Sequence, residues 1–252
     1  MLDLEVIEGI ARITLCNPPV NALSRAWANR FFSILDDLES RDDWRILVLQ
    51  SNQKVFSAGG DIKQYASRLD RADAGELLAE EAAYYQKLFS RISSLPQISI
   101  AVIGGVAAGG GLELALACDL RIASEVTKLG LPEVGVGLLP AGGGTQRMTQ
   151  RCGAGVALRL IGLAELVTGR DALAIGLVEW AVPPAELEVV ANDIAKRLVN
   201  QAPEALQAAK ACIATASDPF RDGFAFELTF PPTLMKTSAT QARIREFLAR
   251  HK

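Results

Sequence analysis

The sequence predicts an α/β protein with a parallel central sheet, followed by a helical C-terminal section. Apolar runs of strand length alternate with helical patterns, mostly at the spacing that a crossover between parallel strands needs. Half of the 252 residues are hydrophobic, which is enough for a sizeable core. A strand, strand, helix order also recurs loosely along the chain, and this order suggests a repeated ββα unit.

The first elements are predicted from local patterns. Residues 4–15 alternate apolar and polar side chains and predict two short strands that meet at Glu8-Gly9. A helix is expected to run from an N-cap at Ser24 to about Glu39. Its apolar face consists of Trp27, Phe31, Leu35 and Leu38.

Further apolar runs and helical patterns fill the rest of the chain. The expected strands are at 44–51, 98–105, 120–124 and 176–183. The expected helices are at about 72–94, 110–118, 143–164 (one or two helices) and 185–214. Residues 216–252 are expected to be helical, with an interruption at Phe230-Pro231-Pro232.

Composition excludes several classes of protein. The formal net charge is −3, with both signs scattered along the chain, and no basic block suggests a nucleic-acid partner. The longest apolar run, 98–108, is too short to span a bilayer. The first ten residues lack the pattern of a signal peptide. We therefore expect a protein of the cytoplasm that binds neither nucleic acid nor membranes.

Cysteine and histidine usage narrows the chemistry. The four cysteines are far apart, form no C-x-x-C pair, and are read as buried or partly buried thiols. The single histidine, His251, lies at the extreme end of the chain, so neither a zinc site nor a histidine-based catalytic pair is expected. Acid–base chemistry would then fall to carboxylates, tyrosine or lysine.

Two glycine-containing loops follow predicted buried strands, at 56–61 and at 104–111. The carboxyl ends of parallel strands meet at one edge of a sheet, so both loops can face one site. Glycines let a ligand approach the backbone, although they also serve tight turns and close packing. The loops match neither the P-loop nor the dinucleotide fingerprint, and 55–59 lacks the first glycine of a nucleophile elbow.

Two glutamates stand in apolar surroundings after glycine- or proline-containing turns. Glu113 follows Gly109–Gly111 in the run GLELALA, and Glu133 lies in LGLPEVGVGLLP. Each alone reads more naturally as a solvated charge, since a glutamate near a helix start complements the helix dipole. Together, beside glycine-rich loops, they suit paired acid–base catalysis in a cleft.

Several ordered segments together resemble the enoyl-CoA hydratase/isomerase family, the crotonases. The segments are NPPVNALS (17–24), VFSAGGDIKQYA (55–66), IAVIGGVAAGGGLELALACDLRIAS (100–124), LGLPEVGVGLLPAGGGTQRMTQRCG (129–153) and AIGLVEWAVP (174–183). The resemblance covers nearly the whole chain and is strongest from 55 to 153.

The resemblance implies a fold and an assembly. It implies a crotonase-type spiral of ββα units over 1–195, which carries the active site, and a helical trimerisation region over 196–252. Homotrimers or dimers of trimers are expected. The implied substrate is an acyl-CoA thioester, so coenzyme A is part of the substrate and neither a cofactor nor a metal is expected.

The resemblance also implies roles for particular residues. The backbone N–H groups of Gly60 and Gly110 would form the oxyanion hole for the thioester enolate. Glu113 and Glu133 match the two catalytic glutamates of the hydratase branch, Glu113 mainly as the base that activates water and Glu133 mainly as the proton donor. The implied substrate-binding positions are Val20, Ala22, Ala58, Gly60, Asp61, Ile62, Gly110, Pro132 and Ala141. The Asp61 side chain is expected to cap the following helix, while its backbone contacts the ligand.

Other members of the family leave alternatives open. Isomerases typically need one glutamate near position 133, and other branches replace one or both acids, so the presence of both favours a hydratase. The rival from another class is a non-catalytic protein on the same fold. The length of the acyl chain and the pathway are not readable from the sequence. The helical segment 64–94 is expected to supply part of the acyl pocket or of the core through its aromatic residues Tyr65, Tyr84, Tyr85 and Phe89.

This sequence departs from the family pattern in three places. Ala141 stands where hydratases commonly have glycine, and its methyl group can narrow the site. The stretch 160–176 matches the family only loosely. The end of the chain is atypical, so the contacts made by 224–252 are in doubt.

Overall fold

The computed structural model describes residues 1–250, and a six-stranded sheet forms the centre of its core. In spatial order the strands are β1 (Leu2–Ile7), β2 (Gly9–Leu15), β3 (Trp44–Ser51), β5 (Ile98–Ile103), β7 (Leu120–Ser124) and β10 (Trp180–Val182). All neighbouring strands are parallel except β1 and β2, the two strands predicted on either side of Glu8-Gly9, which pair antiparallel.

A second sheet of four short strands lies beside the first in the spiral. Its order is β4 (Val55–Ser57), β6 (Val106–Ala108), β8 (Lys128–Gly130) and β9 (Val167–Thr168). The first three are parallel, and each follows a long strand of the main sheet. The sequence analysis missed these strands, because two or three residues are too few to show an alternating pattern. They complete the repeated ββα unit, so the predicted α/β crotonase-type architecture is confirmed.

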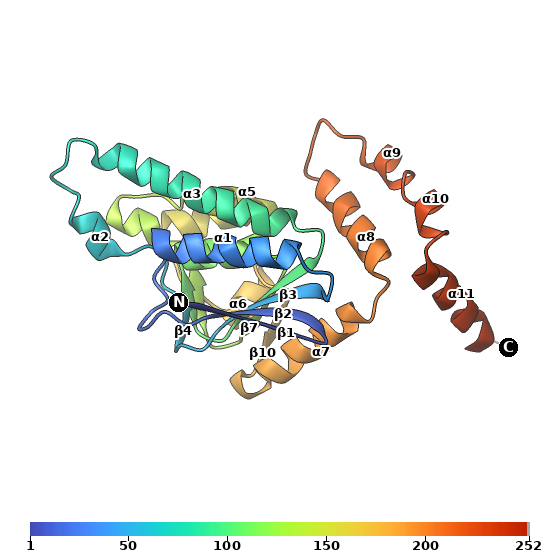
Figure 1. Ribbon diagram of the computed structural model, residues 1–252. Helices are drawn as coiled ribbons and strands as arrows, with labels where there is room; N and C mark the ends of the chain where they lie inside the picture. The colour runs from blue at the N-terminus through green and yellow to red at the C-terminus, as the bar shows by residue number, and fades with distance from the viewer. Residues whose placement is uncertain (251–252) are drawn as a thin grey trace.

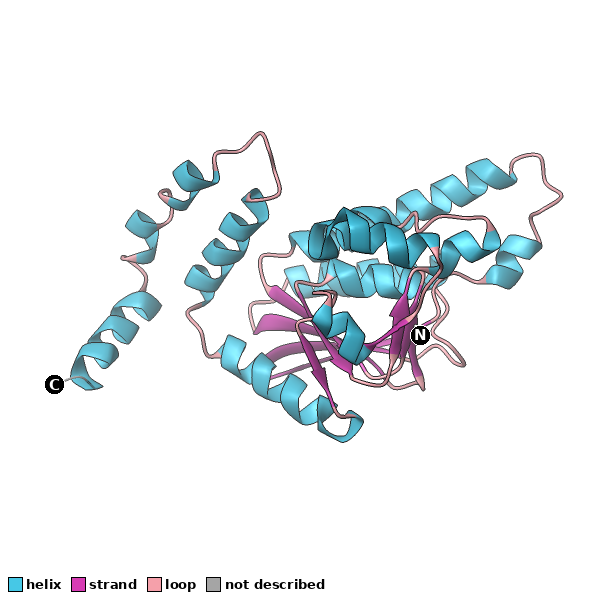
Figure 2. Cartoon of the chain, turned by 180° about the vertical axis from the view of Figure 1, so that it is seen from behind, coloured by secondary structure: helices cyan, strands magenta, loops and turns pink. Residues whose placement is uncertain are grey.

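Helices cover both faces of the main sheet. In the core they are α1 (Arg25–Glu39), α2 (Ile62–Ala66), α3 (Ala74–Ser94), α4 (Gly110–Ala117), η1 (Pro132–Val136), α5 (Gly144–Gly162), α6 (Gly169–Ala174), η2 (Pro184–Glu186) and α7 (Leu187–Val199). Figure 2 shows α7 on the opposite side of the sheet from α1, α3 and α5. Strand β3 serves both sides, because Leu47 and Leu49 pack toward α1 while Ile46 and Val48 pack toward α7.

Local signals account for two of these helices. Ser24 caps α1 as predicted by accepting a hydrogen bond from the Trp27 N–H, and the predicted apolar face of α1 is buried. Helix α5 is broken at Gly153, whose φ of 79° leaves the helical region, which agrees with the expectation of one or two helices there.

The C-terminal arm, residues 203–250, consists of four helices that extend away from the core (Figure 1). They are α8 (Pro203–Thr215), α9 (Gly223–Glu227), α10 (Pro231–Leu234) and α11 (Ser238–Arg250). Pro231 and Pro232 occupy the first turn of α10, where a missing N–H is tolerated, so they begin a new helix instead of continuing an old one. The expected division into 1–195 and 196–252 stays a prediction.

None of the helices within residues 1–250 is both long enough and apolar enough to cross a bilayer. The four cysteines, which are Cys16, Cys118, Cys152 and Cys212, are free thiols. His251, the single histidine at the end of the chain, lies outside the described residues.

Candidate active site

A pocket of about 860 Å³ lies between α2, α3, the start of α4, η1 and the loop that follows η1. Most of its lining is apolar, and two carboxylates face into it. Its lining includes these residues proposed from the sequence: Ala58, Gly60, Ile62, Gly110, Glu113, Pro132, Glu133 and Ala141. The two glycine loops and the two acids therefore share one site.

The backbone at Gly60 and Gly110 forms one wall of this pocket. Gly59 has a φ of 84°, and a Cβ atom there would lie 2.7 Å from the Gly110 nitrogen, so only glycine lets the two loops approach this closely. Gly110 is the first residue of α4, where N–H groups have no partner within the helix. Neither the Gly60 nor the Gly110 N–H donates a hydrogen bond to any residue within 1–250. Both donors are therefore free for a ligand oxygen.

Glu113 projects from the first turn of α4 and is only 5% exposed. Its Oε1 atom accepts a hydrogen bond of 2.8 Å from the Gly144 N–H, which fixes one side of the carboxylate. A Cβ at Gly142 would lie 2.5 Å from Glu113 Oε2, so the loop needs glycine at this approach. Burial raises the pKa of Glu113 to about 7, against the lowering effect of the Gly144 hydrogen bond.

Glu133 projects from η1, directly after Pro132. Its Oε2 atom is buried and makes no hydrogen bond with any residue within 1–250. A Cβ at Gly109 would lie 2.8 Å from Glu133 Oε1, so this carboxylate packs against the turn that begins α4. Burial raises the pKa of Glu133 as well.

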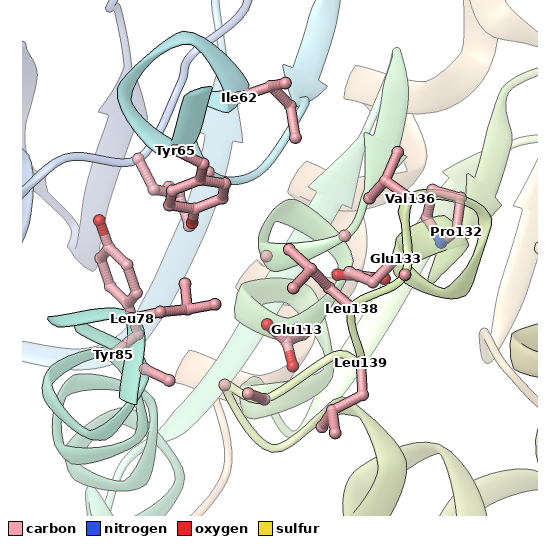
Figure 3. A pocket seen from close by; sticks show the side chains of 18 of the residues that line it. Ile62, Tyr65, Leu78, Tyr85, Glu113, Pro132, Glu133, Val136, Leu138 and Leu139 are labelled. Atoms are coloured by element: carbon pink, nitrogen blue, oxygen red, sulfur yellow. The ribbon is translucent and has the colours of Figure 1, made fainter. Parts of the chain in front are cut away.

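The two carboxylates act on each other across the pocket. After burial and the Gly144 hydrogen bond, the charge of Glu133 is the next largest influence on the pKa of Glu113, and it raises that pKa. Figure 3 shows both side chains reaching into the same space from α4 and η1. Two like charges in one apolar pocket ionise as a pair, which suits one acid and one base at neutral pH.

Comparisons with known proteins agree with this geometry. The model of the enoyl-CoA hydratase/isomerase family matches residues 5–252. The chain belongs to this family. A probable enoyl-CoA hydratase of Bacillus subtilis (strain 168) is 41% identical over 206 residues, which cover 81% of this chain and 78% of that protein.

Two further relatives support the assignment. The short-chain-enoyl-CoA hydratase of Clostridium acetobutylicum is 34% identical over 213 residues, covering 82% of this chain and 78% of that protein. The crystal structure of an enoyl-CoA hydratase from Bacillus anthracis superimposes with a TM-score of 0.91 at 29% identity, covering 99% of this chain and 96% of the other. The chain is therefore an enzyme of the hydratase/isomerase family, as the sequence motifs indicated.

Three of the proposed substrate-binding residues lie beside the pocket without lining it. The Val20 carbonyl accepts a hydrogen bond from the Ala58 N–H, and the Ala22 carbonyl accepts one from Asn17. Asp61 caps α2 as expected, because its side chain accepts a hydrogen bond of 2.9 Å from the Lys63 N–H.

Asn21 supports this region of the hydratase/isomerase site and was missed by the sequence analysis. It is fully buried, with a φ of 50°, and its amide donates to the carbonyl of Phe56 in β4. This bond holds the loop that contains Val20 and Ala22 against the first glycine loop. An asparagine between prolines and an apolar run is a signal for a turn, but not for this long-range contact.

The apolar side of the pocket comes mainly from α3 and from η1 with the loop after it. Of the aromatic residues proposed there, Tyr65 and Tyr85 line the pocket, Phe89 belongs to the core, and Tyr84 bonds Asn29 at the surface. The pocket residues that the sequence analysis did not single out are mostly small or aliphatic: Leu78, Ala79, Ala82, Val136, Leu138 and Leu139. In the sequence, Leu78, Ala79 and Ala82 show only the apolar face of a helix, and this pattern is the same whether the face packs into a core or lines a pocket. Leu138 and Leu139 lie in a loop, where no periodic pattern marks a lining residue.

Proposed function

We propose that this enzyme is an enoyl-CoA hydratase that adds water across the 2,3 double bond of a 2-enoyl-CoA to give a 3-hydroxyacyl-CoA. The observation that carries the proposal is the presence of Glu113 and Glu133 in one pocket beside the free N–H groups of Gly60 and Gly110. The names of the relatives described above agree with this reaction.

The first step depends on the two backbone donors. The thioester oxygen accepts hydrogen bonds from the Gly60 and Gly110 N–H groups, and it becomes more negative as water attacks Cβ. The positive end of α4 points at the same oxygen because Gly110 begins that helix. Each donor aimed at a developing oxyanion in a dry site contributes on the order of 3 kcal/mol.

The carboxylates then move the protons. Ionised Glu113 takes a proton from the water whose oxygen bonds to Cβ, and a pKa of about 7 matches that task near neutral pH. Glu133 in its protonated form gives a proton from its unpartnered Oε2 side to Cα. The sum is one H and one OH added to the double bond, and exchange with solvent restores both acids.

Coenzyme A is part of the proposed substrate and would bind beside the acyl chain. The coenzyme A portion would lie along Val20, Ala22, Ala58, Asp61 and Ile62, on the side of the pocket formed by α2 and the preceding loops. No cofactor or metal is required by the steps above, and a cytoplasmic location stays our expectation.

Isomerisation of a 3-enoyl-CoA is the second candidate reaction. The unpartnered Oε2 atom of Glu133 favours it, because one free carboxylate is enough to move a proton between two carbons. The raised pKa of Glu113 and its position in the pocket favour hydration over isomerisation. A non-catalytic binding protein would have no use for two buried acids, which cost stability.

We also propose that the protein assembles as a homotrimer or a dimer of trimers through its C-terminal arm. Large apolar side chains of the arm lie exposed: Ile213, Phe220, Phe224, Leu228, Met235, Ile244, Phe247 and Leu248. No arm residue within 203–250 lines the pocket. Apolar exposure on this scale is typical of a surface that a second copy covers.

The test is a spectrophotometric assay that follows loss of the enoyl-thioester absorbance of crotonyl-CoA. Wild-type protein should consume it rapidly, and Glu113→Gln and Glu133→Gln should each slow hydration by about 100- to 10,000-fold while still binding the CoA ester. Tyr84→Phe, which alters only a surface contact, is the control. Binding of crotonyl-CoA without hydration, together with turnover of a 3-enoyl-CoA, would replace the hydratase proposal with isomerisation.

A further inference from the structure

A short glycine loop, residues 142–144, connects Glu113 to an arginine that the proposed reaction does not use. Gly144 begins helix α5, and its N–H donates to Glu113 Oε1 at 2.8 Å. A Cβ atom at Gly142 would lie 2.5 Å from Glu113 Oε2. Both carboxylate oxygens of Glu113 therefore pack against this loop.

Arg147 holds the other side of the same glycine loop. Its Nη1 atom donates to the Gly142 carbonyl at 3.1 Å, and its Nη2 atom lies 3.5 Å from the Ser90 hydroxyl on α3. A Cβ atom at Gly143 would lie 2.2 Å from Nη1, so the guanidinium packs directly on the loop. Arg147 is partly buried and does not line the pocket, so it lies next to the site without facing a substrate.

The position of Arg147 is unfavourable for a cation unless a negative charge compensates it. Arg147 lies in the first turn of α5, where the helix dipole favours anions over cations. Burial lowers the pKa of Arg147, and the nearby Glu113 carboxylate raises it, while a guanidinium stays charged at any pH of interest. Glu113 is therefore a compensating charge for this cation.

The same electrostatic interaction acts on Glu113. Burial raises the pKa of Glu113 most, and the Gly144 N–H lowers it. The charge of Glu133 on η1 raises that pKa, whereas the Gly142 N–H and the charge of Arg147 lower it. Loss of Arg147 would remove its charge and release the loop that carries both N–H groups, and each change would raise the pKa of Glu113 further.

Two further titratable groups lie near this pair. The charge of Glu113 acts on Tyr65 of α2, and Cys118, at the end of α4, acts on Arg147. Burial is the main cause that raises the pKa of Tyr65 and of Cys118 to about 12. Both groups therefore stay neutral between pH 4.5 and pH 8, and a pH effect in this range comes from the glutamates.

We propose that Arg147 is a positioning residue for Glu113: it holds the glycine loop 142–144 against the carboxylate and supplies the positive charge behind it. The inference rests on the proposed role of Glu113 as the base that activates water. That role needs a carboxylate that is ionised and fixed in direction. Because Arg147 does not line the pocket, its loss should lower kcat more than it raises KM.

A double-mutant cycle measured by urea unfolding tests this link without using activity. Arg147→Gln, Glu113→Gln and the double variant are compared with the wild type at pH 8 and at pH 4.5, at one protein concentration. At pH 8, Glu113→Gln should stabilise the Arg147→Gln protein more than it stabilises the wild type, by roughly fivefold in the folding equilibrium constant. At pH 4.5 folded Glu113 is protonated, so the two gains should be equal.

Other variants of α5 separate charge from packing. Arg147→Lys keeps the positive charge, so its cycle with Glu113→Gln should show much less non-additivity. Arg151→Gln is the matched control one turn further along α5, where the guanidinium lies 3.4 Å from the Asp119 carbonyl. This control should be additive with Glu113→Gln at both pH values. Arg147→Met, which keeps the apolar stem, replaces Arg147→Gln if that variant does not fold.

The pH profile of kcat/KM for crotonyl-CoA is the second measurement. Its acidic limb should move to higher pH by about half a unit or more in Arg147→Gln and stay in place in Arg151→Gln. An acidic limb that does not move would overturn the proposal, and so would non-additivity that is equal at both pH values or absent at both. If crotonyl-CoA is not hydrated but the pH-dependent non-additivity appears, the link between Arg147 and Glu113 stands and the hydratase proposal fails.

Discussion

The core and the C-terminal arm depart from ordinary protein packing in opposite ways. The core buries polar groups among apolar ones: Glu113, Glu133, Glu81 and Tyr85 are largely buried, and Glu133 has a buried oxygen without a partner within residues 1–250. The arm does the reverse and exposes large apolar side chains such as Phe224, which is 84% exposed. Each departure costs free energy in an isolated chain.

The difference indicates which kind of partner each region needs. Glu113, Glu133 and Tyr85 line one concave pocket, which suits a small ligand. The exposed apolar groups of the arm are spread over α8 to α11, which suits a second protein surface. The buried carboxylate in the core provides the largest measurable test of this comparison.

Glu113→Gln should stabilise the folded core at neutral and higher pH. The pKa of Glu113 rises from its usual value of 4.5 to about 7 on folding, so the folded state holds this proton more tightly than the unfolded state. Stability therefore falls as pH rises from about 4.5 to 7 and stays low above 7. Removing the charge should add roughly 3 kcal/mol to the free energy of unfolding at pH 8, and little at pH 4.5.

Urea unfolding at several pH values measures this effect. Glu188→Gln, at an exposed position on α7, is the control and should leave the pH dependence of the wild type unchanged. An equal stability difference at pH 4.5 and pH 8 would show that the burial of the Glu113 charge is not its cause.

Phe224→Asp should break the proposed assembly without unfolding the core. This side chain makes few contacts in one chain, but a charge there would oppose burial against a second copy. A buried aromatic anchor of an interface contributes about 2 kcal/mol or more, so association should weaken roughly 30-fold or more. Analytical ultracentrifugation over a range of protein concentrations measures this weakening of association. The control is Leu69→Asp, which places the same charge at an exposed position outside the arm. A monomeric wild-type protein would contradict the arm-mediated assembly.

Helix α1 and strand β3 were predictable because neighbouring residues in the sequence determine them. Helix α1 follows from Ser24 and a regular apolar face, and β3 follows from an uninterrupted apolar run. The short strands β4, β6 and β8 were not predictable, since three residues show no period and depend on pairing with distant segments. The sheet that supports both glycine loops was therefore missing from the sequence-based description.

The candidate site was predicted in part by pattern and in part by resemblance. From the residues alone, Glu113 and Glu133 each read as an ordinary surface charge, although together they suited paired acid–base catalysis. The family motifs then implied a catalytic role for each. The structure brings both into one pocket. Tyr85 was named only as a possible pocket or core aromatic, because its place in the pocket wall depends on how α3 packs and not on the order of residues in α3.

A final prediction concerns the contact that joins the two regions. Lys210 of α8 is only 12% exposed at its side chain, and its Nζ donates to Asp119 Oδ2 at 2.6 Å and to the Gln97 carbonyl at 2.9 Å. Asp119 follows the end of α4 and also accepts from Ser99. Lys210→Met should keep the apolar stem but leave Asp119 without its cation, and it should cost roughly 2 kcal/mol of stability.

A double-mutant cycle separates this link from a general packing effect. Lys210→Met, Asp119→Asn and the double variant are compared by urea unfolding at constant protein concentration, so that assembly does not confound the result. Non-additivity of 1 kcal/mol or more would show that the arm and the segment after α4 are joined through this ion pair. Additive effects would mean that the Lys210–Asp119 pair does not couple the arm to the segment after α4, and the active-site helix would then be independent of this contact.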